Sequence, residues 1–280
     1  MQAAAETLRQ VHCPILGRTL ALPERPQRIV SLLSGLTEGL YAFGAGERVA
    51  GVTRYCGRYV SGLTAPVVGD YLRIDEELLR RINPDLVLAT DGVQLGVARR
   101  LAAAGFPVYV LPLPNSFGGL LDNLRLTGAL CGEMMAALEL TRRMAQVAAE
   151  LRVASPRRRP RVYVELWFGR HLRTIGGLTF IHDLVEMAGG TPLFADHAQA
   201  YFKPDLTAVA AAQPEVVLIF SEADDHPVDA GQLCAARGWT GAWDFRLIEA
   251  GIQRGRNLIH DGPSLIETAQ WLQGRLTDKC

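Results

Sequence analysis

Aromatic side chains gather in the segments that follow predicted β-strands. They are Tyr55, Tyr59 and Tyr71 in the first half of the chain, and Trp167, Phe168, Tyr201 and Phe202 in the second. An aromatic ring offers a flat apolar face and fixes few torsion angles when it binds. Any single ring could instead anchor its loop on the core. Because matching loops of both halves carry them, the rings favour a binding site for a flat, largely apolar ligand.

The sequence contains no motif that would perform catalysis or hold a metal ion. The nucleophile motif G-x-S-x-G, the Walker lysine motif and the zinc motif H-E-x-x-H are absent. The six histidines form no i, i+4 pair, and the five cysteines, Cys56 and Cys280 among them, form no C-x-x-C pair. Gly44-Ala45-Gly46 follows a predicted helix, so we interpret it as a helix end and not as a phosphate-binding turn. We predict a non-enzymatic protein without a metal site or an enzyme cofactor.

The charge composition argues against two classes of partner. The 280 residues include 29 Lys and Arg against 29 Asp and Glu, so the formal net charge is zero. Nucleic acids and anionic membranes favour basic surfaces, so neither is expected as the main partner. No apolar stretch approaches the roughly 18 residues of a membrane-spanning helix. The first residues also lack the pattern of a secretory signal, and the chain as written is expected to be soluble.

An internal repeat supplies the elements that would position the aromatic residues. The run Pro26–Leu32 recurs at Pro160–Leu166, and Ile82–Leu88 recurs at Ala212–Leu218, each roughly 130 residues later. Short apolar runs that alternate with helical segments are typical of buried parallel strands in βαβ units. We therefore predict an α/β protein with two Rossmann-like lobes, each with a central parallel sheet. An insertion around Trp167–His171 follows the first strand of the second lobe, where open α/β sheets bind ligands, and is expected to be a ligand loop.

A helix-forming segment separates the two halves. Residues 118–155 are almost entirely helix-forming, and Glu133–Ala154 contains no proline and keeps apolar residues at helical spacing. A helix of that length, about 33 Å at 1.5 Å per residue, can cross from one lobe to the other. The predicted organisation is an N-terminal lobe over 1–117, a helical linker over 118–155 with a single long rigid helix, and a C-terminal lobe over 156–280.

The chain resembles one family over nearly its whole length. The similar segments are PQRIVSL, TEGLYAFGAGERVAGVT, DEELLRRINPDLVLA, TFIHDLVEMAGGTPLF and LTAVAAAQPEVVLI. They resemble the ABC-importer substrate-binding proteins built on a helical backbone, whose members carry cobalamin, haem or ferric siderophores. Within that family, Gly51–Cys56 and the segment VVGDYLRID are most similar to the cobalamin-binding branch.

The resemblance implies a function and a set of site residues. A corrinoid, cobalamin or cobinamide, would be held in a cleft between the lobes and delivered to the permease dimer of an ABC importer. The protein would be a periplasmic or otherwise extracytoplasmic monomer that meets the membrane only through the permease. Glu77 and Glu186, one on each lobe, would dock on arginines of the permease. The expected ligand contacts are Tyr55, Tyr71, Trp167, Phe168, Tyr201 and Arg256.

Other functions stay open at this point. Haem would suit the same scaffold with Tyr55, Tyr71 or His197 as its axial ligand. A ferric siderophore would instead require basic contacts, for which the candidates are Arg54, Arg73, Arg170 and Arg256. The cysteines and the missing signal favour a cytoplasmic corrinoid or haem carrier that never meets a permease. An α/β enzyme that uses the cleft for catalysis ranks last, since no nucleophile–base pair supports it.

Overall fold

A computed structural model describes residues 7–155, 157–222 and 227–277 of the chain. These residues pack into two compact units. Unit 1 comprises residues up to 114, residues 120–143 and residues 261–263; unit 2 comprises residues 115–119, 144–260 and those from 264 onward. Both units combine helices with a β-sheet, so the predicted α/β class with two lobes is confirmed. The boundaries expected from the sequence, 1–117, 118–155 and 156–280, stay a prediction.

Unit 1 is built on a five-stranded parallel sheet with strand order β5-β4-β3-β6-β7. Its strands are β3 (Ile29–Ser31), β4 (Val49–Thr53), β5 (Val67–Gly69), β6 (Leu86–Thr90) and β7 (Val108–Leu111). The chain adds β4 and β5 on one side of β3 and then β6 and β7 on the other, which is the order of a Rossmann-type sheet. β3, β6 and β7 are buried along their whole length, as expected for parallel strands covered on both faces.

The remaining elements of the first part of the chain surround this sheet. The helices are α1 (Ser34–Ala42), α2 (Glu76–Ile82), α3 (Leu95–Ala103) and α4 (Phe117–Leu130), and the short 3₁₀ turns are η1 (Gly46–Arg48), η2 (Cys56–Arg58) and η3 (Gly92–Gln94). An antiparallel hairpin of β1 (Leu8–Cys13) and β2 (Arg18–Pro23) precedes the sheet. Asp75 caps α2 by accepting the Leu78 N–H at 2.9 Å, which explains why the helix begins there.

Unit 2 is built on a mixed sheet with order β11-β9-β8-β12-β13, in which β10 also pairs with β8. The strands are β8 (Arg161–Phe168), β9 (His171–Ile175), β10 (Thr191–Pro192), β11 (Tyr201–Phe202), β12 (Val216–Ser221) and β13 (Arg246–Ala250). β8, β12 and β13 are parallel, as predicted, whereas β9 and β11 run antiparallel to their neighbours. The insertion expected as a ligand loop is therefore a tight β8–β9 hairpin, in which Phe168 pairs with His171 and Gly169 adopts a φ of 56°.

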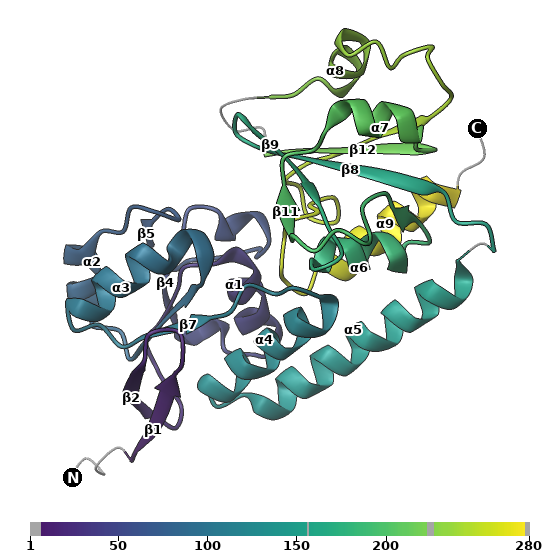
Figure 1. Ribbon diagram of the computed structural model, residues 1–280. Coiled ribbons are helices and arrows are strands. Elements are labelled where there is room, and N and C mark those ends of the chain that lie inside the picture. The colour runs from purple at the N-terminus through teal and green to yellow at the C-terminus, as the bar shows by residue number, and fades with distance from the viewer. Residues whose placement is uncertain (1–6, 156, 223–226, 278–280) are drawn as a thin grey trace. The chain divides into compact units, whose positions relative to one another are not determined.

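Four helices cover the two faces of this sheet. They are α6 (Phe180–Met187), α7 (Leu206–Ala212), α8 (Ala230–Ala236) and α9 (Leu265–Thr277). Figure 1 shows α7 and α8 on one face of β8 and β12, and α6 and α9 on the other. On the α7–α8 face, Tyr163 and Ile219 of the sheet pack against Val209, Cys234 and Trp239 in a buried cluster. Burial of these apolar side chains from both layers holds the helices on the sheet.

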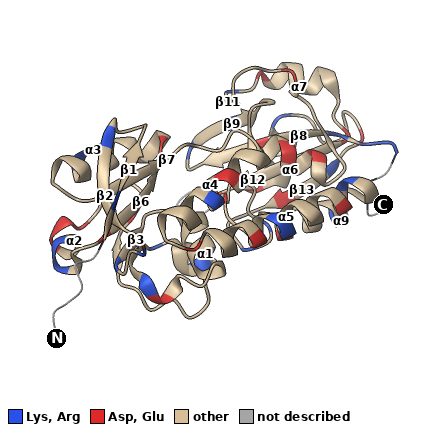
Figure 2. Ribbon diagram, turned by 90° about the horizontal axis from the view of Figure 1, so that it is seen from below, with Lys and Arg blue, Asp and Glu red and all other residues tan. Residues whose placement is uncertain are grey.

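The long helix expected over 133–154 is observed as α5 (Met134–Ala154). Its residues up to 143 belong to unit 1 and those from 144 onward belong to unit 2. Arg143 pairs with Glu139 one turn away, and Figure 2 shows both acidic and basic residues on α5 and on α2. Within the described residues, no helix is long and apolar enough to cross a membrane.

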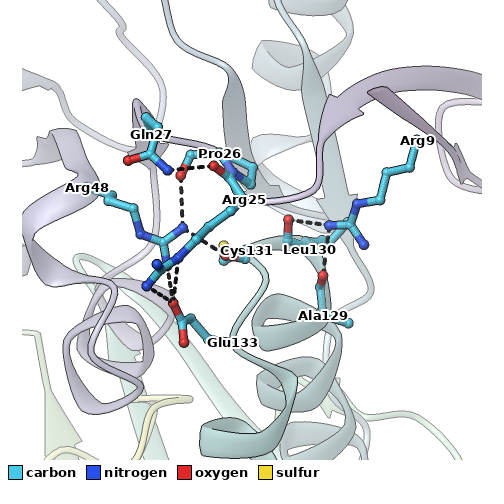
Figure 3. A network of polar contacts seen from close by, with 9 residues as sticks. All are labelled: Arg9, Arg25, Pro26, Gln27, Arg48, Ala129, Leu130, Cys131 and Glu133. Carbon is cyan, nitrogen blue, oxygen red and sulfur yellow. Dashed lines mark hydrogen bonds and ion pairs between the residues drawn. The ribbon is translucent and has the colours of Figure 1, made fainter. Parts of the chain in front are cut away.

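A network of arginines attaches the turn between α4 and α5 to the rest of unit 1 (Figure 3). Buried Arg48 donates to the carbonyl oxygens of Pro26 and Cys131 at 2.9 and 2.8 Å, and to the Glu133 carboxylate at 2.6 Å. Arg25 donates to the same carboxylate at 2.7 Å. The last carbonyl groups of a helix have no partner within it, and Arg48 supplies a donor to the Cys131 carbonyl directly after α4. The network thus fixes the point from which α5 begins.

The end of α4 receives a second arginine, from the β1–β2 hairpin. Arg9 donates to the carbonyl oxygens of Ala129 and Leu130 at 2.8 and 2.6 Å (Figure 3). A positive charge near the C-terminus of a helix is favoured by the helix dipole. The hairpin is therefore held on unit 1 by contacts with the C-terminal turn of α4.

Candidate functional site

Two of the predicted ligand residues of unit 1 lie together at the carboxyl ends of adjacent strands. Tyr55 follows β4 and Tyr71 follows β5, and these strands pair in parallel. Their rings stack with centroids 4.5 Å apart and planes inclined by 18°. Both side chains are half-buried, so part of the stacked pair faces solvent. The sheet thus brings together a flat aromatic surface from two loops.

The surroundings of Tyr71 keep its phenol protonated. Burial raises the pKa of Tyr71, and the negative charge of Asp261 raises it further, while a hydrogen bond with Ser34 has the opposite effect. Ser34 is the first residue of α1, and Asp261 comes from the segment 261–263 that packs in unit 1. At neutral pH Tyr71 therefore presents an uncharged ring.

Asp70 shapes the loop that carries Tyr71. Its carboxylate accepts the backbone N–H groups of Leu72 and Arg73 at 2.7 and 2.8 Å, and these hydrogen bonds lower the pKa of Asp70. An aspartate that accepts N–H groups two and three residues later is a common way to fix a turn. The position of Tyr71 thus depends on its neighbour in the sequence.

Two cations lie over the ring of Tyr55. The guanidinium carbons of Arg54 and Arg58 are 5.0 and 5.2 Å from the ring centroid, within the range of a cation–π contact. Arg54 also donates to the Tyr55 hydroxyl at 3.0 Å. Arg54, Arg58 and Arg73 are all exposed. The aromatic surface of unit 1 is therefore flanked by positive charge.

The predicted contacts of unit 2 separate into two groups. Phe168 and Tyr201 meet edge to face with ring centroids 6.5 Å apart, and Tyr201 is 39% exposed. Trp167 precedes Phe168 in the same strand, so its side chain points to the opposite face of the sheet. There it packs, half-buried, against the cluster that contains Tyr163 and Trp239.

Two further candidates of unit 2 contact other aromatic rings. Arg256, in the loop after β13, is exposed and lies over the Trp271 ring of α9 at 5.9 Å. His197 stacks on Phe202 with ring centroids 3.7 Å apart and accepts the Gln199 N–H on Nδ1. The structure thus pairs Tyr55 with Tyr71 and Phe168 with Tyr201. The cleft predicted between the units stays a prediction.

The buried carboxylate of Glu165, which was not among the predicted site residues, lies beside Trp167. Glu165 is fully buried, accepts the Trp167 indole N–H at 2.7 Å, and forms a two-pronged ion pair with Arg237. A charge in the middle of an otherwise apolar, buried strand requires a partner, and this pattern was visible in the sequence. The sequence did not identify the partner, Arg237, which directly follows α8.

The two predicted docking residues differ in their surroundings. Glu77 is exposed on α2. Glu186, on α6, is half-exposed and lies 3.6 Å from the Nε2 of His182.

His182, Asp183 and Glu186 also offer ligand atoms within 4.8 Å of one another, the spacing of a potential cation site among the described residues. Asp183 already accepts the Phe117 N–H at 2.6 Å.

Comparisons with known proteins place this arrangement among binding proteins. A family model described as periplasmic binding protein matches residues 29–242. A cobalamin-binding protein of Halobacterium salinarum is 30% identical over 224 residues, which cover 77% of this chain and 60% of that relative. The chain therefore spans less than two thirds of that relative's length. A vitamin B12-binding protein of Yersinia pestis is 27% identical over 211 residues, which cover 73% of this chain and 74% of the relative.

Solved structures show the same fold. The periplasmic heme binding protein HutB of Vibrio cholerae superposes with a TM-score of 0.76 and 22% sequence identity, over 90% of this chain and 99% of that one. At this level of identity the likeness concerns the fold and not the ligand.

Proposed function

Because the chain belongs to the periplasmic binding protein family, we propose that it captures a cobalamin-like corrinoid and delivers it to an ABC importer. The observation that carries the choice of ligand is the stacked Tyr55–Tyr71 surface at the carboxyl ends of β4 and β5. A corrin ring is broad and largely flat, so an aromatic platform suits it. The two relatives named for cobalamin and vitamin B12 support the same ligand.

Aromatic residues of both units are the proposed contacts. In unit 1 these are Tyr55 and Tyr71, and in unit 2 they are Trp167, Phe168 and Tyr201. Arg256 is the proposed polar contact. The amide groups at the rim of a corrin would be hydrogen-bonded by such polar side chains, which fix the orientation of a ligand held mainly by apolar contact.

Haem on the same scaffold is the second candidate, with Tyr55, Tyr71 or His197 as its axial ligand. One observation argues against Tyr71 as its axial ligand. Tyrosine binds iron as a phenolate, and burial with a nearby negative charge raises the pKa of Tyr71, which opposes loss of its proton. A ferric siderophore would instead engage the exposed Arg54 and Arg73, or Arg170 and Arg256.

Delivery to the importer would use Glu77 and Glu186 as docking residues on the permease dimer. Each exposed ion pair would add little affinity, but two of them on separate units would set the orientation of the complex. The proposal includes a monomeric protein that acts outside the cytoplasm, as the family description suggests, and it includes no enzymatic activity.

Calorimetric titration of the purified protein with cyanocobalamin, cobinamide and haemin tests the ligand. Saturable one-to-one binding of a corrinoid is expected. Tight haemin binding without a corrinoid response would leave the proposed transport role in place and make haem the ligand. If none of the three compounds binds, a ferric siderophore becomes the preferred candidate ligand.

A transport assay tests delivery. The double variant Glu77→Ala and Glu186→Ala is expected to abolish corrinoid uptake by cells and to leave corrinoid affinity unchanged. Glu139→Ala, an exposed glutamate on α5, is the matched control and should transport normally. Normal uptake by the double variant would favour a cytoplasmic carrier that works without a permease.

A further inference from the structure

The buried carboxylate of Glu165 forms the centre of a hydrogen-bond network on one face of β8. Its Oε2 accepts from the Tyr163 hydroxyl at 2.9 Å and from Arg237 at 2.7 Å. Its Oε1 accepts from the Trp167 indole N–H at 2.7 Å and from Arg237 at 3.0 Å. Tyr163, Glu165 and Trp167 alternate along the strand, so their side chains share that face.

The network holds a full charge away from water. Glu165 is fully buried, and the side chain of Arg237 is only 12% exposed. Burial of an unpaired carboxylate would cost several kcal/mol, and a forked arginine pair with further hydrogen bonds is the arrangement that offsets this cost. The carboxylate accepts from four donors at once, which leaves it a single orientation.

The arginine is fixed from its other side as well. Arg237 directly follows α8, and its guanidinium carbon lies 4.9 Å from the ring centroid of Trp239. Trp239 in turn meets the ring of Tyr163 edge to face, with centroids 6.0 Å apart. Arg237 and Tyr163, two of the three partners of Glu165, are therefore held by the same buried core.

Trp167 lies one residue before the end of β8 and is only partly buried. Its backbone carbonyl accepts the Glu222 N–H beyond β12 at 3.2 Å, so its main chain lies at the carboxyl edge of the sheet. Without the bond to Glu165, the half-buried indole could rotate about its side-chain torsions. Fixing it before the ligand arrives removes an ordering cost from binding.

We propose that Glu165, held by Arg237, is a positioning residue that orients the Trp167 indole for contact with the corrinoid. The inference rests on the proposed function, since Trp167 acts there as a ligand contact. Glu165 itself does not touch the ligand, and its effect passes through the indole N–H.

A double-mutant cycle measured with cyanocobalamin tests the coupling. Glu165→Gln presents an NH₂ group to partners that are all donors, and it is expected to weaken binding roughly tenfold. Trp167→Phe keeps an aromatic ring but removes the N–H. In the Trp167→Phe background, Glu165→Gln is expected to change affinity by less than about twofold, because the connection is already gone. Glu133→Gln, at a carboxylate that also pairs with arginines but lies in unit 1, is the matched control and should bind normally.

A second readout follows the indole directly. The Trp167 Nε1–H resonance, assigned by its loss in Trp167→Phe, should exchange slowly with solvent in the wild type. Exchange should become roughly tenfold faster in Glu165→Gln as the hydrogen bond is lost. If Glu165→Gln does not fold, Arg237→Lys takes its place in the cycle, because it keeps the charge and loses the fork.

The outcomes separate this inference from the proposed function. Suppose that the wild type binds a corrinoid but Glu165→Gln lowers affinity equally in the wild-type and Trp167→Phe backgrounds. That result, or an unchanged exchange rate of the indole N–H, would overturn the positioning role and leave the proposed function unaffected. Failure of the wild type to bind any corrinoid would overturn the function and the inference together.

Discussion

The rings of Tyr55 and Tyr71 stack on each other with centroids 4.5 Å apart, although they belong to different loops. The parallel pairing of β4 with β5 brings the ends of the two strands to one edge, and the rings meet there. A ligand that approaches this edge meets a preformed aromatic surface.

The first prediction concerns this surface. Tyr71→Ala removes one ring and the support of the other, so it should weaken cyanocobalamin binding by tenfold or more, roughly 1.4 kcal/mol. Tyr71→Phe, which keeps the ring, should bind within about twofold of the wild type. Calorimetry measures both, and equal affinities for Tyr71→Ala and the wild type would remove this surface from the binding site.

A second prediction concerns the contact between Gly35 and the segment 261–263. A Cβ atom on Gly35 would lie 2.7 and 2.8 Å from the carbonyl carbon and oxygen of Asp261, and a backbone cannot yield as a flexible side chain can. Gly35→Ala should therefore lower the free energy of unfolding by about 1–3 kcal/mol.

The matched control for this variant is Gly96, in α3, where a Cβ atom would meet nothing within 4 Å. Gly96→Ala should leave stability unchanged or raise it by about 0.5–1 kcal/mol, because alanine is the better helix former. Chemical denaturation measures both variants. Equal effects from the two substitutions would contradict the predicted contact.

A third prediction concerns the network that fixes the start of α5. Arg48→Met removes three hydrogen bonds and leaves Glu133 with Arg25 alone, so it should lower the free energy of unfolding by about 3 kcal/mol. Arg143→Met, which breaks an exposed pair with Glu139, should cost less than about 0.5 kcal/mol. Thermal unfolding followed by circular dichroism compares them, and similar midpoints would show that the network is not a source of stability.

A fourth prediction concerns acid. The N–H groups of Leu72 and Arg73 lower the folded-state pKa of Asp70 below its ordinary value of 3.8. The stability that the ionised carboxylate contributes is therefore complete above that ordinary value and disappears as the pH falls through the folded-state pKa. Asp70→Ala should reduce stability more at pH 6 than at pH 3. A stability difference that does not change with pH would show that Asp70 contributes no ionised hydrogen bonds to the turn.

The sequence by itself determined the class of fold because strand and helix patterns are local. The recurrence of Pro26–Leu32 at Pro160–Leu166 predicted the first strand of the main sheet in each unit, and β3 and β8 begin in those runs. The proline-free segment Glu133–Ala154 predicted α5 to within one residue. Aromatic residues after strands pointed to the carboxyl edges, since strand direction alone decides which loops meet there.

The hairpin at Trp167–His171 differs from the ligand loop that the sequence pattern predicted. A two-residue turn at Gly169 continues β8 into antiparallel β9, so the insertion extends the sheet where a loop was expected. Strand alternation then sends Trp167 and Phe168 to opposite faces, and the period of two was already present in the sequence.

Only the tertiary structure decided which distant residues became partners. Arg237 is remote from Glu165 in the chain, and the packing of α8 on the sheet joins them. Asp261 is far in sequence from Gly35, and the packing of the segment 261–263 in unit 1 brings the two together. Contacts of this kind depend on the spatial order of strands and helices. Spacing along one chain does not encode them, because each charge could pair with any opposite charge that the fold brings near.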